Sequence, residues 1–191
     1  PGKNPRTNMQ FLTFLVTVIK AVNDSNELIR ASVMNEPNSY RLGGHEAPPA
    51  IISVFLGSYL INLLNELASK VTEKKMTPAQ KTELKLGIGK IPEILLDNTD
   101  RNRTSPFAFT GNRFEFRAVG SSANCSAAMI ALNSAVAYQL TKFKKEVDQI
   151  IKKGRTKDEA IFQTLKRYII DSENVLFEGD NYSKEWYKEA E

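Results

Sequence analysis

Residues 113–117 bring three charged side chains onto a short stretch of chain. Their sequence, Arg113-Phe114-Glu115-Phe116-Arg117, alternates charged and aromatic residues. This period of two predicts a strand with plus, minus, plus on one face, about 7 Å apart, and phenylalanines that pack on helices. One interpretation is an exposed edge strand with cross-strand ion pairs. The other is a site for an anionic substrate, with a carboxylate-held Mg²⁺ or Mn²⁺ between two arginines.

Two segments upstream add groups that could take part in the same chemistry. The run Arg101-Asn102-Arg103-Thr104 supplies two guanidiniums, which grip phosphate or carboxylate with paired hydrogen bonds. It is either a phosphate clamp or a solvated loop. Further upstream, Arg41 is followed by Gly43-Gly44 and then Glu46. This segment is either a mobile flap that carries an acid–base group, or a linker with a glutamate near a helix N-terminus.

Composition limits the other classes of function. The chain has 191 residues, 25% of them charged, and a net charge of +4, which suits one globular domain. Positive and negative residues balance over residues 142–191, so a nucleic-acid surface is not expected there. The most apolar run, residues 50–64, is too short and too polar to span a bilayer. We therefore expect neither a nucleic-acid nor a membrane partner.

The scarcity of histidine and cysteine restricts the metal chemistry. His45 and Cys125 are the only residues of their kinds, so a zinc centre built from such ligands is excluded. We expect Cys125 to be a small buried residue rather than a nucleophile. A single cysteine also favours a reducing compartment, which predicts a cytoplasmic location.

The remaining patterns predict an α+β fold that is rich in helices, with a short strand and loop block around residues 87–120. Helices are expected over residues 8–23, from Pro48-Pro49 to about Leu67, over residues 123–153, and from a capping box at Thr156 onwards. Gly154 should end the third of these helices. Its expected apolar stripe comprises Met129, Leu132, Val136, Leu140, Phe143, Val147 and Ile151.

Taken together, the three charged motifs resemble those of the type III glutamine synthetases. That family carries, in the same order, an arginine before a glycine-containing flap ending in Glu-Ala-Pro, then Arg-Asn-Arg-Ser/Thr, then Arg-x-Glu-x-Arg. The corresponding residues here are Arg41 with residues 43–48, residues 101–104 and residues 113–117. The run from Asp100 to Arg113 is similar to the type III enzymes in particular.

The resemblance implies ATP-dependent ligation of ammonia to glutamate through γ-glutamyl phosphate. Arg41 and Arg117 would hold the glutamate α-carboxylate, and Glu46 would shield the intermediate and accept a proton from ammonium. Arg103 would stabilise the transferred phosphoryl group. The remaining roles concern ATP and metal: Arg113 would contact the ATP phosphates, and Glu115 would bind one of the divalent metals, Mg²⁺ or Mn²⁺.

The resemblance also implies that residues 1–191 are one partial catalytic domain. The family's other metal ligands and its N-terminal domain belong to segments upstream of these motifs, so we expect the isolated chain to be inactive. The family also forms homo-oligomers, usually dodecamers. Two departures are the 54 residues between Glu46 and Arg101 and the absence of a further arginine shortly after Arg103. Alternative functions are another glutamate–amine ligase, or a non-catalytic nucleotide-binding or assembly module.

Overall fold

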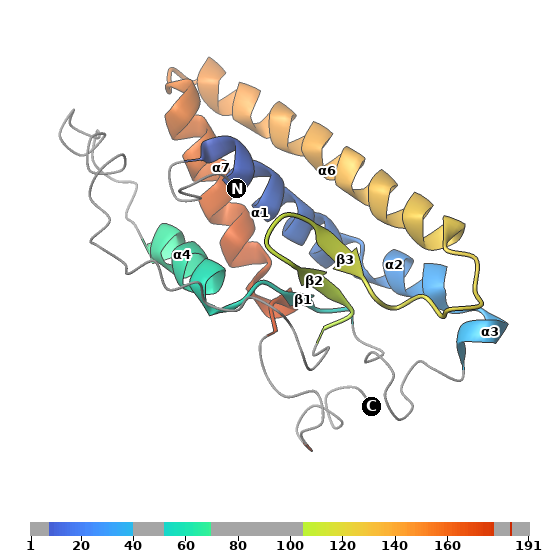
Figure 1. Ribbon diagram of the computed structural model, residues 1–191. Coiled ribbons are helices and arrows are strands. Elements are labelled where there is room, and N and C mark those ends of the chain that lie inside the picture. The colour runs from blue at the N-terminus through green and yellow to red at the C-terminus, as the bar shows by residue number, and fades with distance from the viewer. Residues whose placement is uncertain (1–7, 40–51, 70–104, 178–183, 185–191) are drawn as a thin grey trace.

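The computed structural model describes residues 8–39, 52–69, 105–177 and residue 184, and it has the helix-rich α+β architecture that the sequence predicts (Figure 1). The helices are α1 (Met9–Asp24), α2 (Asn26–Val33), α3 (Glu36–Ser39), α4 (Ser58–Ser69), α6 (Ser126–Lys152) and α7 (Lys157–Asp171), followed by the 3₁₀ helix η2 (Glu173–Val175). The strands are β1 (Val54–Phe55), β2 (Phe107–Phe109) and β3 (Phe114–Phe116).

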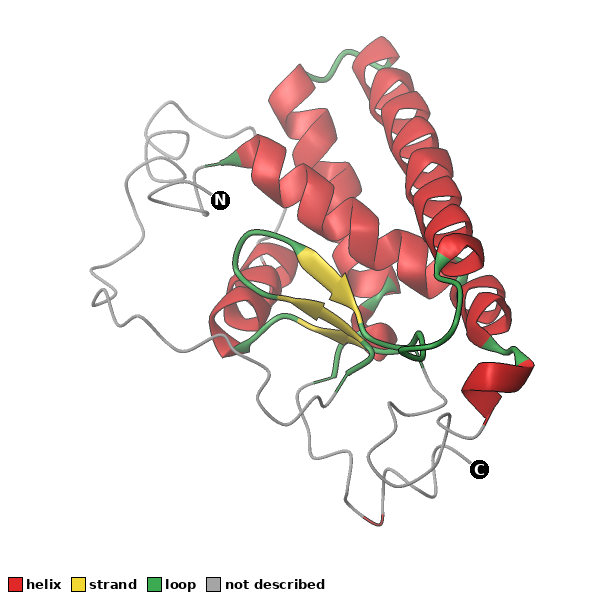
Figure 2. Ribbon diagram, turned by 45° about the vertical axis from the view of Figure 1, so that its right-hand side comes forward, coloured by secondary structure: helices red, strands yellow, loops and turns green. Residues whose placement is uncertain are grey.

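Helix α1 is the centre of the core. It packs against both α6 and α7, and these two helices also pack against each other. Its buried residues lie on almost every side, as expected for a helix enclosed by neighbours: Leu12, Leu15, Val16, Thr17, Ile19, Lys20, Ala21 and Val22. Asn8 caps the helix by accepting a hydrogen bond from the Phe11 amide at 2.9 Å. Figure 2 shows α1 between the long helices and the small sheet.

The three strands form one sheet in the order β1-β2-β3. Strand β1 runs parallel to β2, with Val54 opposite Phe107. Strand β2 runs antiparallel to β3, so the two form a hairpin. This part of the structure confirms the predicted strand and loop texture from residue 105 onwards, whereas residues 87–104 lie outside the described part of the chain.

The helix predicted from Pro48 onwards begins later than expected. Residues 48–51 lie outside the described part of the chain, and residues 52–57 are not helical, with strand β1 at Val54–Phe55. Helix α4 starts only at Ser58, after Gly57 turns the chain at a φ of +82°. Pairing of β1 with β2 overrides the helical spacing of the apolar residues, because β-branched Ile52 and Val54 suit a buried strand.

The ends of α6 and α7 follow the predicted capping signals. Gly154, at a φ of +88°, stops α6. The Thr156 hydroxyl accepts from the Glu159 amide, and the Glu159 carboxylate accepts from the Thr156 amide, which completes the capping box of α7. None of the helices within the described ranges is long and apolar enough to cross a membrane.

The predicted apolar stripe of α6 is only partly correct. Phe143 and Val147 are buried, but Met129 and Ile151 are exposed. The first half of the helix instead turns small residues and one amide inward: Ala128, Ala131, Ala135 and Gln139. Close approach of α6 to its neighbours explains the difference, because small side chains fit where two helix backbones pack tightly.

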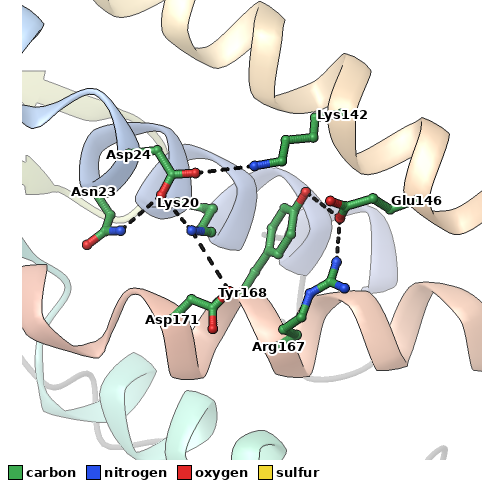
Figure 3. A network of polar contacts seen from close by, with 8 residues as sticks. All are labelled: Lys20, Asn23, Asp24, Lys142, Glu146, Arg167, Tyr168 and Asp171. Carbon is green, nitrogen blue, oxygen red and sulfur yellow. Dashed lines mark hydrogen bonds and ion pairs between the residues drawn. The ribbon is translucent and has the colours of Figure 1, made fainter.

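A buried cation joins the three long helices (Figure 3). The ammonium of Lys20, a residue only 8% exposed, lies 2.5 Å from the Asp24 carboxylate on α1 and 3.9 Å from Asp171 on α7. Lys142 of α6 lies 3.7 Å from the other Asp24 oxygen. Each helix therefore contributes a charge to the same cluster, so the ion pairs favour one arrangement of the bundle.

A second set of contacts lies beside the cation, between α6 and α7. The Glu146 carboxylate accepts hydrogen bonds from the Tyr168 hydroxyl at 2.8 Å and from Arg167 at 2.5 Å. Burial, together with this carboxylate, raises the pKa of Tyr168 above its usual range, so the phenol stays protonated and remains a donor.

Asp24 sets the pH range over which this cluster stabilises the fold. Burial alone would raise the pKa of Asp24, but hydrogen bonds from Lys20 and Asn23, with nearby positive charge, hold it below its usual 3.8. A carboxyl with a lowered pKa stabilises the folded state fully above the unfolded value, and this contribution is lost as the pH falls through the folded value.

We expect Asp24→Asn to lower the free energy of unfolding by about 2 kcal/mol at pH 7, because Lys20 loses a charged acceptor. The difference in unfolding free energy between this variant and the unsubstituted chain should shrink as the pH falls below 3.8, the usual pKa of an aspartate. Urea unfolding measured stepwise from neutral to acidic pH tests both points. Asp148→Asn is the control, since it breaks an exposed Lys144–Asp148 pair of the same i,i+4 spacing. Equal losses of unfolding free energy in the two variants would contradict the stabilising role assigned to Asp24.

Candidate functional site

The hairpin of β2 and β3 fixes the ends of the charged segment. The Thr110 amide donates to the Arg113 carbonyl at 2.9 Å, and the Arg117 amide donates to the Pro106 carbonyl at 2.6 Å. Gly111, at a φ of +96°, provides the turn between the strands. The backbones of Arg113 and Arg117 are therefore both held to the neighbouring strand.

The phenylalanines of β3 form one aromatic cluster with those of β2. Phe114 stacks on Phe107 with centroids 4.8 Å apart and planes at 4°, while Phe116 meets the edge of Phe107 at 6.0 Å. Phe109 lies 5.2 Å from Phe114 and 5.8 Å from Phe11 of α1. The aromatic face of the hairpin is thus turned toward α1, as the alternation predicts.

Arg113, Glu115 and Arg117 lie together on the opposite face, where both arginines pair with the glutamate. Arg113 donates to Glu115 Oε1 from Nε at 3.3 Å and from Nη2 at 3.2 Å. Arg117 donates to Oε2 from Nε at 3.3 Å and from Nη2 at 3.1 Å. Each carboxylate oxygen therefore has its own guanidinium. We call these three residues the Arg–Glu–Arg triad.

The ion pairs keep Glu115 charged. Hydrogen bonds from Arg117 and then from Arg113 outweigh the small effect of burial and hold the pKa of Glu115 below its ordinary value. The carboxyl is consequently ionised throughout the neutral range. The triad carries a net charge of +1, so it attracts anions while it still presents a carboxylate to cations.

The triad's two arginines differ in exposure. The side chain of Arg113 is 71% exposed, whereas that of Arg117 is 21% exposed. Arg113 can therefore turn away from Glu115 at little cost in packing, since an exposed ion pair contributes little stability. Arg117 is held more firmly by its surroundings.

The edge-strand interpretation of residues 113–117 is correct in one respect and wrong in another. Strand β3 does lie at an edge of the sheet. Its ion pairs run along the strand rather than across it, because Glu115 is paired with Ala108, which has no charged group. The ion pairs therefore do not explain how β3 is held to β2.

The side chain of Asn38 anchors the chain just after β3, a role that was not predicted from the sequence. Its buried amide donates to the Val33 carbonyl at 2.8 Å and to the Ala118 carbonyl at 2.7 Å. Ala118 directly follows Arg117, so this side chain ties the end of the triad to α2. An asparagine in a short polar stretch of sequence gives no local signal of such a distant partner.

Several residues proposed from the sequence lie outside the described part of the chain: Arg41, Glu46, Arg101 and Arg103. Their positions relative to the triad stay predictions. The expected burial of Cys125 is wrong, because this residue is exposed at the start of α6, where its thiol donates to the Met129 sulfur at 3.7 Å.

The triad could supply one ligand to a divalent metal. Glu115 has the hard oxygen atoms that Mg²⁺ and Mn²⁺ prefer. Within the described ranges, no group of three His, Cys, Asp or Glu residues could hold a metal ion. The chemistry of Glu115 therefore fits such a metal as one ligand of a set that must be completed elsewhere.

Comparison with known proteins identifies the family. A family model described as the glutamine synthetase C-terminal domain matches residues 160–191. The chain is 65% identical to a glutamine synthetase of Bacteroides fragilis (strain YCH46), over all of its own length and 26% of that protein's length. The chain belongs to the glutamine synthetase family.

Two further relatives match over almost the whole chain. One is a type-3 glutamine synthetase of Dictyostelium discoideum, 41% identical over 97% of the chain and 25% of that protein. The other is a glutamine synthetase of Butyrivibrio fibrisolvens, 39% identical over all of the chain and 26% of that protein. The chain thus spans about a quarter of the length of the relatives it matches, and the resemblance to the type III enzymes is confirmed.

We expect the position of the triad to depend on the aromatic cluster that anchors the hairpin. We expect Phe107→Ala to lower the free energy of unfolding by about 3–5 kcal/mol, because Phe107 is 2% exposed and its loss leaves a cavity under β3. Phe14→Ala, at a side chain 49% exposed on α1, should cost less than about 1 kcal/mol. Urea unfolding of the two variants measures the difference, and similar losses would show that Phe107 does not anchor the hairpin.

Proposed function

We propose that the protein containing this chain joins ammonia to L-glutamate at the expense of ATP, through γ-glutamyl phosphate, and yields glutamine. The observation that carries this proposal is the Arg–Glu–Arg triad, whose residues match the family's Arg-x-Glu-x-Arg motif and lie together on one face of β3. Phosphoryl transfer is driven mainly by positioning and by neutralisation of charge, which guanidiniums and a carboxylate-held metal supply.

Within the triad, each residue has a distinct role in the proposed reaction. Arg113 contacts the ATP phosphates, a role that its high exposure allows. Glu115 contributes oxygen ligands to Mg²⁺ or Mn²⁺, and the metal supplies positive charge next to the transferred phosphoryl group. Arg117, which is held more firmly, binds the α-carboxylate of glutamate with paired hydrogen bonds.

Residues outside the described part of the chain complete the proposed site. Arg41 shares the glutamate carboxylate with Arg117, and Arg103 stabilises the transferred phosphoryl group. Glu46 shields γ-glutamyl phosphate from water and accepts a proton from ammonium, which makes ammonia the nucleophile. The resemblance of the three motifs supports these assignments.

The setting of the reaction is also part of the proposal. Residues 1–191 are one partial catalytic domain that is inactive in isolation, a proposal supported by the family resemblance and by the quarter of its relatives' length that the chain spans. The enzyme works in the cytoplasm as a homo-oligomer, and the family resemblance favours a dodecamer.

The decisive assay measures glutamine formed by the full-length enzyme from glutamate, ATP and ammonia. Preference for a polyamine over ammonia would overturn the glutamine assignment.

Glu115→Ala in the full-length enzyme should abolish glutamine formation and weaken Mn²⁺ binding, while the oligomer remains intact. The reason is that Glu115 pairs with exposed or half-buried arginines at the two ends of its own strand, so its loss opens no cavity. Turnover, Mn²⁺ titration and size-exclusion chromatography measure the three effects. Glu173→Ala, at an exposed position on η2, is the control. Near-normal turnover of the Glu115 variant would exclude Glu115 as a metal ligand.

We expect substitutions at the two arginines of the triad to affect the KM of different substrates. Arg113→Lys keeps a positive charge but loses the paired donors, so we expect it mainly to raise the KM for ATP. Arg117→Lys should mainly raise the KM for glutamate, as should Arg41→Ala. Steady-state kinetics with each substrate varied in turn measures the split. An effect of Arg117→Lys on ATP alone would contradict its assignment to the α-carboxylate.

A further inference from the structure

The side chain of Asn38 joins two segments that lie far apart in the sequence. Its Nδ2 group donates to the Val33 carbonyl at 2.8 Å and to the Ala118 carbonyl at 2.7 Å. All three residues are buried, with at most 2% of their surface exposed. The Val33 carbonyl also accepts from the Asn35 amide at 3.1 Å. Loss of the Asn38 amide would therefore be felt mainly at Ala118, whose buried carbonyl is hard for water to reach.

Asn38 is itself fixed to the helical core. Its backbone amide donates to the Asn35 carbonyl at 2.9 Å and to the Asn35 side-chain oxygen at 3.2 Å. Val33, which accepts one of its side-chain bonds, is the last residue of α2, and α2 packs against α1 and α6. The hydrogen bond to Ala118 thus connects the end of β3 to the helices. It fixes this end of the hairpin relative to the core.

The hydrogen bond to Ala118 acts at the Arg117 end of the triad. The Arg117 amide donates to the Pro106 carbonyl at 2.6 Å, and Ala118 is the next residue, so the backbone of Arg117 is held from both sides. Arg113 lies four residues earlier, where its carbonyl accepts from the Thr110 amide. Since a strand rises about 3.3 Å per residue, about 13 Å of chain separates the two arginines. A shift at Ala118 should therefore move Arg117 and leave Arg113 in place.

The paired hydrogen bonds between a guanidinium and a carboxylate are sensitive to such a shift. The two N–H groups must lie parallel to each other and face the two oxygens. A displacement of about 1 Å in a binding site can reduce the rate about 100-fold. Arg41, the other residue assigned to the α-carboxylate, follows Asn38 by three positions in the sequence. A change at Asn38 therefore lies close along the chain to one glutamate-binding residue and acts through Ala118 on the other.

We propose that Asn38 is a positioning residue for glutamate. By holding the Ala118 carbonyl to the end of α2, it sets the backbone position from which Arg117 reaches the α-carboxylate. This inference rests on the proposed function, which assigns Arg117 to that group. Asn38 acts through Arg117 and does not touch the substrate, because its amide is buried and donates to two backbone carbonyls.

Steady-state kinetics of the full-length enzyme tests the inference. Asn38→Ala should raise the KM for glutamate about 10-fold and leave the KM for ATP within about twofold, because only glutamate depends on Arg117. Asn26→Ala is the matched control, since the Asn26 Nδ2 group at the opposite end of α2 donates to the Ile52 carbonyl at 2.6 Å. It makes the same kind of link away from the triad, and we expect its loss to change neither KM. Equal rises in the two KM values, or the same rise for glutamate in the control, would overturn the inference.

A milder substitution covers the case in which the alanine variant does not fold. Asn38→Ser keeps one donor in the buried position, so it should cost less stability than alanine. Its hydroxyl ends one bond short of the Asn38 nitrogen and cannot reproduce both hydrogen bonds. We expect a smaller rise in the KM for glutamate, again without a change in the KM for ATP. A folded serine variant with both KM values unchanged would overturn the inference.

Hydrogen exchange of the full-length protein follows the backbone of Arg117 without any need for catalysis. In Asn38→Ala the Arg117 amide should exchange about 10-fold faster than in the unsubstituted protein, because its bond to Pro106 opens more often. The Thr110 amide, at the other end of the hairpin, should keep its rate. Unchanged exchange at Arg117 would overturn the inference.

The two measurements separate this inference from the proposed function. Glutamine formation without a selective rise in the KM for glutamate would refute the positioning role of Asn38 and leave the proposed function intact. Faster exchange at Arg117 in a full-length protein that forms no glutamine would refute the proposed function and leave Asn38 as the anchor of Arg117.

Discussion

The packing of the hairpin phenylalanines against α1 is the constraint on which the site depends. Strands of two or three residues cannot hold a sheet together alone. Stacking of Phe114 on Phe107, and contact of Phe109 with Phe11, attach the hairpin to the buried helix. A shift of register by one residue would exchange the two faces of β3. The aromatic cluster thereby determines that the triad faces away from the core.

Local signals in the sequence were sufficient for the parts of the fold that depend on neighbouring residues. The alternation of residues 113–117 predicted both the strand and the grouping of the triad. The capping box at Thr156 predicted the start of α7. In both cases the interacting groups lie within a few residues of each other, so their spacing alone carries the information.

Features that depend on distant residues could not be predicted in this way. Strand β1 depends on the pairing of Val54 with Phe107, and the helical spacing of the apolar residues around Val54 gave no sign of this distant partner. The inward side of α6 was misjudged because close packing selects alanine, while Met129 and Ile151, both expected inside, are exposed. The buried ammonium of Lys20 also depends on distant partners, because α7 brings Asp171 to it and α6 brings Lys142 to Asp24. Sequence spacing contains none of these partners.

The charge balance of the triad explains why it needs further structure to act in the proposed reaction. Each guanidinium of the triad is paired with Glu115. A dication that approaches alone meets two positive groups within a few ångströms, and an anion alone must compete with Glu115 for its arginines. In the proposed reaction Glu115 would exchange its arginines for the metal, while Arg113 would bind phosphate oxygens and Arg117 the α-carboxylate of glutamate. Every charge then keeps a partner, provided that other segments supply the remaining oxygen ligands beside β3.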